Sequence, residues 1–180
     1  MPLIANIVLF QIGWFGCVLG AANGLPWVGS VLALIIAGLH LRLAQRPRVE
    51  LKLLLIAVMI GYAWDSAIAS VGLITFTGGG LAQGLAPLWM AALWLVFATT
   101  LNVSMRWLRG RWLLAALFGA VGGPLAYYGG VQLGALSFPD LPLGLATQTV
   151  GWAVLMVLML RLSVYFDGIR PSKNEGPAYV

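Results

Sequence analysis

The first 41 residues carry no charged side chain, and this run is the strongest constraint on the fold. A helix needs about 20 apolar residues to cross the hydrocarbon core of a bilayer, so the run is long enough for two crossings. Asn23-Gly24 and then Pro26 interrupt it near its middle, and such residues mark a tight turn. The chain is therefore predicted to begin with a helical hairpin, with helices at residues 3–22 and 26–45.

The composition extends this prediction to the whole chain. Hydrophobic residues make up 61% of the sequence and charged residues only 8%, whereas a soluble domain carries about 25% charged residues. So few charges cannot cover a water-soluble surface. We expect an all-α, polytopic membrane protein: a bundle of six transmembrane helices in one domain over residues 1–167, with a polar tail at 168–180. The remaining four helices are expected at 50–75, 87–108, 112–130 and 143–166.

The basic residues predict the orientation. All ten Lys and Arg fall in the segments that follow the second, fourth and sixth predicted helices, as groups of four, three and three. The opposite loops contain only Asp140 among charged residues. Loops rich in Lys and Arg stay on the cytoplasmic side, so both termini are expected to be cytoplasmic. Because the clustering is explained by topology, we expect no nucleic-acid partner.

Asp65 is the most unusual residue of the predicted membrane segments. It lies about 15 residues into the third helix, or about 22 Å from its cytoplasmic end. A carboxyl group at that depth is costly and marks a candidate functional site. Tyr127, Tyr128 and Gln148 are predicted at similar depth. Two interpretations remain open: Asp65 is a structural clasp, protonated and hydrogen-bonded to Tyr128 or Gln148, or it is a site of proton transfer.

A second polar layer is predicted near the cytoplasmic ends of the helices. Its candidate residues are His40, Asn6, Asn102, Ser104, Arg42 and Arg106. His40 lies about 15 Å below Asp65, so a direct pair between them is not expected. His40 could exchange protons near neutral pH or hold a hydrogen bond to a neighbouring helix. The arginines mark topology, and as a group they could also hold an anionic lipid headgroup.

The sequence contains few residues that could bind a metal or react as a thiol. One His and one Cys leave no metal-binding cluster, and we expect no metal and no cofactor. Cys17 lies in an apolar run and is expected to be buried and inert. Trp64, Trp94 and Trp152 fall deep in the predicted helices, where each needs a packing partner or an acceptor for its N–H group.

Several motifs resemble those of a known family. They are Phe10-Gln11 with Gly13-Trp14, Pro26-Trp27, His40-Leu41, Gly61 with Asp65, Ala86-Pro87-Leu88-Trp89-Met90, Leu93-Trp94, Phe97-Ala98-Thr99-Thr100-Leu101, Gly123-Pro124-Leu125 with Tyr128, and Gly134-Ala135. Over nearly its whole length the chain resembles a bacterial inner-membrane family known as a domain of unknown function (number twenty-eight seventy-eight). The resemblance implies one full-length domain in that membrane and a link to membrane-lipid modification, but no reaction.

Three functions remain open at this stage. The first is a non-enzymatic accessory protein that binds membrane lipids, or a lipid-modifying enzyme, through the cytoplasmic-side layer around His40. The second is a small proton-coupled transporter that uses Asp65. The third is a membrane-embedded enzyme with His40 as general base. Whether the protein is an enzyme is not decided by these residues.

Overall fold

The computed structural model describes residues 1–78, 80, 82 and 84–169. The predicted all-α bundle of six helices is confirmed. Five of the helices are long and apolar enough to cross a membrane, while α4, with 14 residues, is shorter. The chain is therefore a multi-pass membrane protein. The helices are α1 (Leu3–Ala22), α2 (Pro26–Leu43), α3 (Pro47–Ser70), α4 (Leu88–Leu101), α5 (Trp112–Gln132) and α6 (Leu141–Tyr165).

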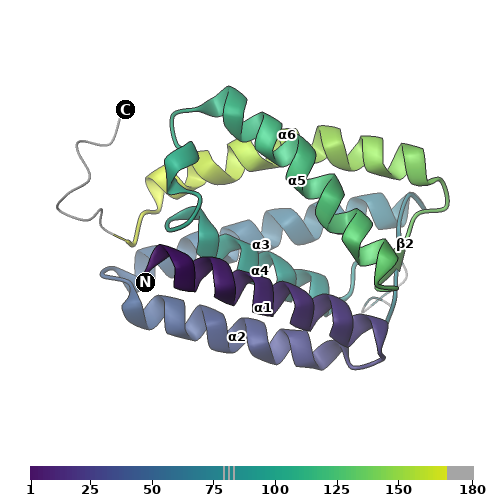
Figure 1. Cartoon of the computed structure of the whole chain (residues 1–180), viewed down its shortest axis with the longest axis horizontal. Helices are drawn as coiled ribbons and strands as arrows, with labels where there is room; N and C mark the ends of the chain where they lie inside the picture. The colour runs from purple at the N-terminus through teal and green to yellow at the C-terminus, as the bar shows by residue number, and fades with distance from the viewer. Residues whose placement is uncertain (79, 81, 83, 170–180) are drawn as a thin grey trace.

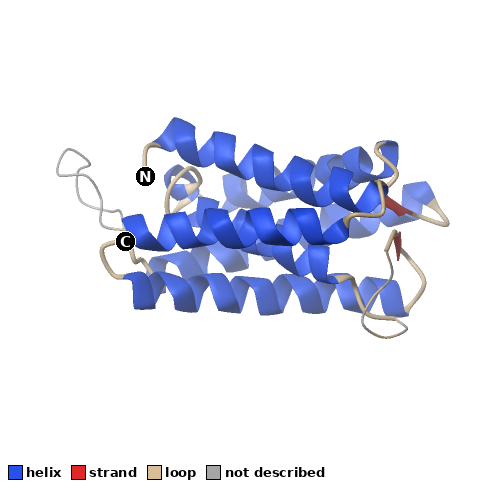
Figure 2. Cartoon of the chain, turned by 90° about the horizontal axis from the view of Figure 1, so that it is seen from below, coloured by secondary structure: helices blue, strands red, loops and turns tan. Residues whose placement is uncertain are grey.

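Helix α4 is the centre of the bundle. It packs against α1, α2 and α3, while α5 and α6 form a closely packed pair on the other side of the molecule (Figure 1). Ten of the 14 residues of α4 are buried. A helix that is apolar all round is typical of a position surrounded by other helices. Most of the helices run roughly along one common direction, as Figure 2 shows from a second side, whereas α5 lies obliquely across α6 in the view of Figure 1.

Helix α4 ends at Leu101, so the predicted end near residue 108 is wrong. Residues 106–108 form a separate 3-10 turn, η1 (Arg106–Leu108). The hydroxyl groups of Thr99 and Thr100 donate to the carbonyls of Val96 and Phe97 at 2.7 and 2.6 Å. Such local bonds compete with the helical ladder near its end. The apolar pattern alone does not register this competition.

Two further differences concern the opposite end of the bundle. Helix α3 stops at Ser70 and not near residue 75, because Gly72 adopts a left-handed φ of 74° that ends a helix. The chain then forms strand β1 (Thr75–Phe76), which pairs antiparallel with β2 (Leu136–Ser137). This small sheet joins the α3–α4 connection to the α5–α6 connection, and it was not expected from the apolar pattern.

The basic residues gather at one end of the molecule, which we call the basic end. It contains the α2–α3 turn, the α4–α5 turn and the end of α6. The side of the membrane that it faces stays a prediction. Gly168 also lies there, because its carbonyl accepts from the backbone N–H groups of Gln45 and Arg46. Gly168, the first residue of the predicted tail, is thus held against the α2–α3 turn, and residues 170–180 lie outside the described part. The described basic residues are Arg42, Arg46, Arg48, Lys52, Arg106, Arg109, Arg111 and Arg161.

Candidate functional site

Asp65 is fully buried between three helices. Its Oδ2 accepts a hydrogen bond from Trp94 Nε1 on α4 at 2.6 Å. Its Oδ1 accepts from the hydroxyl of Tyr127 on α5. Each carboxyl oxygen therefore has a donor from a different helix. The burial that is so costly for a lone carboxyl group is compensated by these two bonds.

Gly61 explains how Trp94 reaches Asp65. The glycine lies one helical turn before Asp65, on the same face of α3. A Cβ atom at Gly61 would stand 1.9 Å from Cδ2 of the Trp94 ring, so any side chain there would displace the indole. The small residue lets the ring lie flat against α3 with its N–H directed at Asp65. In the sequence, a glycine one turn before Asp65 indicates that a neighbouring helix packs closely on this face, but it does not indicate that Trp94 is the residue in contact.

The partners expected from the sequence are only partly the ones observed. Tyr128 is 40% exposed and makes no hydrogen bond to Asp65, because adjacent helical residues point about 100° apart. Gln148 is buried, but its Oε1 accepts from Trp64 Nε1 at 3.3 Å instead. The expected bonds from Asp65 to Tyr128 or Gln148 are thus not formed. Tyr127, predicted at this depth, takes that place.

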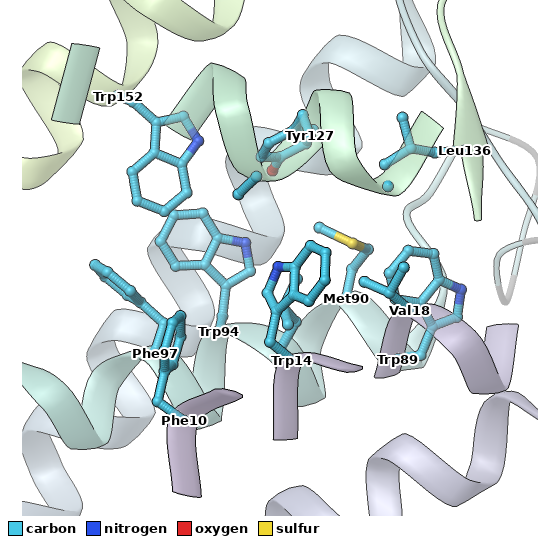
Figure 3. A pocket seen from close by; sticks show the side chains of 13 residues that line it. Phe10, Trp14, Val18, Trp89, Met90, Trp94, Phe97, Tyr127, Leu136 and Trp152 are labelled. Carbon is cyan, nitrogen blue, oxygen red and sulfur yellow. The ribbon is translucent and has the colours of Figure 1, made fainter. Parts of the chain in front are cut away.

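A half-enclosed cavity of about 60 Å³ lies beside this carboxyl group. It is bounded by α1, α4, α5, α6 and β2, and seven of its thirteen lining residues are aromatic (Figure 3). Trp94 and Tyr127 belong to the wall and at the same time hold Asp65. The carboxyl group therefore lies directly behind an aromatic surface. The aromatic lining residues are Phe10, Trp14, Trp89, Trp94, Phe97, Tyr127 and Trp152.

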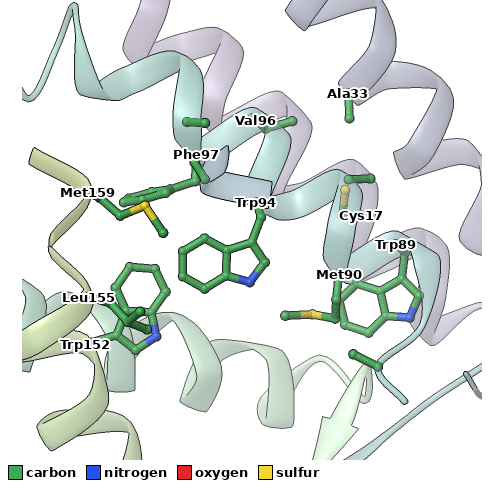
Figure 4. Close-up of a cluster of buried hydrophobic side chains, with 14 of the residues drawn as sticks. Cys17, Ala33, Trp89, Met90, Trp94, Val96, Phe97, Trp152, Leu155 and Met159 are labelled. Carbon is green, nitrogen blue, oxygen red and sulfur yellow. The ribbon is translucent and has the colours of Figure 1, made fainter. Parts of the chain in front are cut away.

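The three deep tryptophans each lie against a glycine of a neighbouring helix. A Cβ atom at Gly151 would come within 2.1 Å of the Trp64 ring, and one at Gly123 within 2.1 Å of the Trp152 ring. The rings of Trp94 and Trp152 are stacked, with centroids 4.8 Å apart and planes at 9° (Figure 4). These contacts are the packing partners that we expected for the three deep tryptophans.

The N–H groups of these three tryptophans differ in their hydrogen bonding. Those of Trp64 and Trp94 donate to Gln148 and Asp65. The Nε1 of Trp152 is buried and has no hydrogen-bond partner among the described residues. A buried donor without an acceptor is uncommon in native structures.

The basic end contains a second buried polar cluster. His40 Nε2 lies 2.7 Å from Glu50 Oε1, and both side chains are fully buried. The other oxygen, Glu50 Oε2, accepts from Asn102 Nδ2 at 2.7 Å and from the N–H of Gly168 at 2.9 Å. Glu50 is thus the hub of the cluster, although the sequence reasoning assigned it no role. It is the main functional candidate that was missed.

A signal for the His40–Glu50 pair was present in the sequence. His40 lies three residues before the end of α2, and Glu50 lies three residues after the start of α3. Two residues at equal distance from the turn of a helical hairpin lie at the same height. Pro47, at the start of α3, locates that turn. Depth counted from the turn would therefore have paired these two side chains.

The cluster continues through two arginines. Arg109 donates to Asn102 Oδ1 and, at 2.9 Å, to Asp167 Oδ2. Arg106 also donates to Asp167, and to the carbonyl of Ile169 at 2.6 Å. Burial lowers the pKa of the Arg109 guanidinium, and the hydrogen bond and charge of Asp167 partly oppose that shift. The two cations and two carboxyl groups are thereby matched inside the protein.

The remaining candidates of the predicted polar layer separate from this cluster. Asn6 donates to the carbonyl of Thr99 at 3.1 Å, and its Oδ1 accepts from the N–H of Ser104 at 3.2 Å. These bonds cover the end of α4. Arg42 is exposed. The structure thus joins His40, Asn102 and Arg106 in one network and leaves the others outside it. No group of three His, Cys, Asp or Glu side chains in the described part could hold a metal ion.

Comparison with known proteins places the chain in a family. Residues 3–158 match the family described as protein of unknown function (DUF2878). No curated protein and no solved structure matches the chain. The match covers nearly the whole chain and confirms the resemblance seen in the motifs. The chain therefore belongs to the DUF2878 family of proteins of unknown function.

Proposed function

We propose that the protein is a non-enzymatic membrane protein that binds the apolar part of a lipid in the aromatic cavity. The observation that carries the proposal is the cavity itself, whose lining is almost entirely apolar and contains seven aromatic side chains. Binding sites for apolar molecules are concave, lined by such side chains and largely formed in advance.

The surroundings of the cavity support a lipid ligand. Two of its walls are α1 and α5, and both helices carry exposed large hydrophobic residues on their outer faces. In a membrane those faces contact lipid chains, so the open side of a half-enclosed cavity between them meets hydrocarbon and not water. A lipid chain or ring could therefore enter from the side.

The cluster around His40 and Glu50 at the basic end is less suited to lipid binding than the aromatic cavity. A lipid site around His40 was the first expectation, but His40 and Glu50 are fully buried and bonded to each other. Their burial leaves no surface for a ligand. The same burial weighs against His40 as a catalytic base, because His40 does not line the aromatic cavity. Exposed basic residues such as Arg42 and Lys52 remain available for anionic headgroups.

Tryptophan fluorescence tests the proposal directly. In a background with the exposed Trp27 and Trp107 replaced by phenylalanine, reconstitution with lipids brominated on their acyl chains should quench the remaining fluorescence. Ala126→Phe, which fills the cavity from α5, should reduce that quenching by about half. Leu125→Phe, on the exposed face of the same helix, is the matched control. Equal quenching in both variants would overturn the proposal.

A proton-coupled carrier is the second candidate, and one observation favours it. The Tyr127 hydroxyl bonds Asp65 while its ring lines the cavity, so one side chain connects a protonatable group with the open space. The test is pH-dependent uptake of substrates into proteoliposomes. Asp65→Asn should abolish it in a protein that still folds, and unchanged uptake would remove Asp65 from the mechanism.

A further inference from the structure

We propose that the aromatic cavity selects a lipophilic organic cation, such as a quaternary ammonium group on an alkyl chain, which is attracted by the aromatic rings and by the carboxylate of Asp65 behind them. The inference rests on the proposed binding in this cavity and specifies the charge of the ligand. Trp94 and Tyr127 connect the two features, because both line the cavity and both donate to Asp65.

The hydrogen bonds of Asp65 suit a negative charge. Trp94 Nε1 can only donate, and it does so to Oδ2 at 2.6 Å, while the Tyr127 hydroxyl donates to Oδ1. Trp152 Nε1 faces the Tyr127 hydroxyl, so a donor lies beside the hydroxyl oxygen while the hydroxyl hydrogen is directed at Asp65 (Figure 3). Such bonds are stronger to a carboxylate than to a neutral carboxyl group.

This carboxylate has no counter-ion among the described residues. The described Lys, Arg and His residues lie at the basic end, where the ion pairs join His40 to Glu50 and two arginines to Asp167. Buried charges in proteins are ordinarily paired. The two neutral donors lower the cost of the buried carboxylate without cancelling its charge. A cation in the adjoining cavity would therefore supply the missing partner.

The cavity wall also suits a cation. Figure 3 shows aromatic rings from α1, α4, α5 and α6 gathered around one space. The face of an aromatic ring attracts a cation that lies within about 6 Å of its centre, and Trp does so most strongly. Four of the seven aromatic lining residues are tryptophans. Walls of this kind are typical of sites that recognise quaternary ammonium groups.

The lining narrows the class of cation further. A metal ion such as Ca²⁺ needs about six to eight oxygen ligands, whereas the Tyr127 hydroxyl is the only side-chain oxygen among the lining residues. A primary ammonium group has three N–H donors, which this apolar wall would leave without acceptors. A quaternary ammonium group donates no hydrogen bond, so it loses the least on entering. Its alkyl chain can lie on the open side of the cavity, toward the lipid chains.

The test uses three single-chain probes that differ in charge: dodecyltrimethylammonium, its uncharged analogue in which carbon replaces the nitrogen, and dodecyl phosphate. Each is added to the full chain reconstituted in brominated phosphatidylcholine. Displacement of the brominated chains from the cavity is measured as recovery of tryptophan fluorescence. We expect the cation to act at a mole fraction about tenfold lower than the carbon analogue, and the anion to be the weakest of the three.

Two carboxyl variants test the part played by Asp65. Asp65→Asn keeps the size of the side chain and removes its charge, so it should reduce the advantage of the cation over the carbon analogue about tenfold. Asp140→Asn is the matched control, because Asp140 is exposed in the α5–α6 connection, and it should keep the full advantage. An unchanged advantage in Asp65→Asn would overturn the proposal.

A ring variant covers the case in which Asp65→Asn does not fold. Trp14→Leu removes one ring of the α1 wall and leaves both donors to Asp65 in place. It should weaken the cation about threefold more than the carbon analogue. Equal weakening of the two probes would contradict the cation site.

The unmodified protein separates this proposal from the proposed function. Equal potency of the cation and the carbon analogue, or a stronger effect of the anion, would overturn the cation site while binding in the cavity stands. If brominated lipid does not quench the fluorescence, or Ala126→Phe leaves the quenching unchanged, the proposed function itself fails.

Discussion

His40 Nε2 and Glu50 Oε1 lie 2.7 Å apart at the basic end, with both side chains fully buried. The pair joins α2 to α3 across their connecting turn, and Glu50 extends the link to Asn102 beyond α4. Removing one partner of such a buried pair leaves the other group buried without its hydrogen bond, which strongly destabilises the folded state.

His40→Ala should therefore reduce the free energy of unfolding by about 3 kcal/mol, because Glu50 Oε1 is left buried without its hydrogen-bond partner. Thermal unfolding in detergent, followed by circular dichroism, measures the change. Lys52→Ala is the control, since Lys52 is exposed two residues along the same helix. Equal stability of the two variants would contradict a role for the pair.

Tyr127→Phe should lower the free energy of unfolding by about 1–2 kcal/mol, because Asp65 Oδ1 loses its only described donor. Tyr128→Phe removes the hydroxyl from the adjacent residue, which is 40% exposed, and should change it by less than about 0.5 kcal/mol. The same unfolding experiment compares the two. A larger effect at Tyr128 would restore the partner that the sequence suggested.

Gly61→Ala should destabilise the protein by about 1–3 kcal/mol, since the added Cβ would stand 1.9 Å from the Trp94 ring. The displaced indole should also change the near-ultraviolet circular dichroism. Gly38→Ala provides the comparison, because a Cβ there meets nothing within 4 Å and alanine favours a helix. A neutral Gly61→Ala would mean that Trp94 is not seated on α3.

Asn6→Ala should cost about 1–3 kcal/mol, because the carbonyl of Thr99 and the N–H of Ser104 lose their side-chain partner at the end of α4. Melting temperature is again the readout. Asn23→Ala is expected to be nearly neutral, since Asn23 is exposed and its side chain bonds only Leu19 of its own helix. If both variants melt alike, Asn6 does not hold α4 in place.

The orientation can be tested by cysteine labelling. Gln45→Cys lies at the basic end and Pro139→Cys in the opposite α5–α6 connection, and both positions are exposed. A membrane-impermeant maleimide should label the second variant in intact cells and the first only after permeabilisation. Cys17 is fully buried and should remain unlabelled in the parent protein. The reverse pattern would place the basic end outside.

The depth of each residue along its helix was largely predictable from the sequence. The depth of Asp65 and its separation from His40 follow from counting residues at about 1.5 Å each. The rotation of each helix was not predictable in the same way. Tyr127 and Tyr128 have nearly the same depth, yet only Tyr127 faces Asp65. Trp94 was recognised as needing an acceptor, but nothing in the sequence assigned it to Asp65.

The sequence by itself determined how many helices form and where the charges gather. Both follow from the length of the apolar segments against the bilayer thickness and from the high cost of charge in hydrocarbon. The tertiary structure alone decided which side chains meet. Helix α4 lies between α1, α2 and α3 instead of beside its neighbour α5, and that placement brings Trp94 and Tyr127 to opposite oxygens of Asp65. Helix order and rotation depend on packing shape at every interface together, which no single segment encodes.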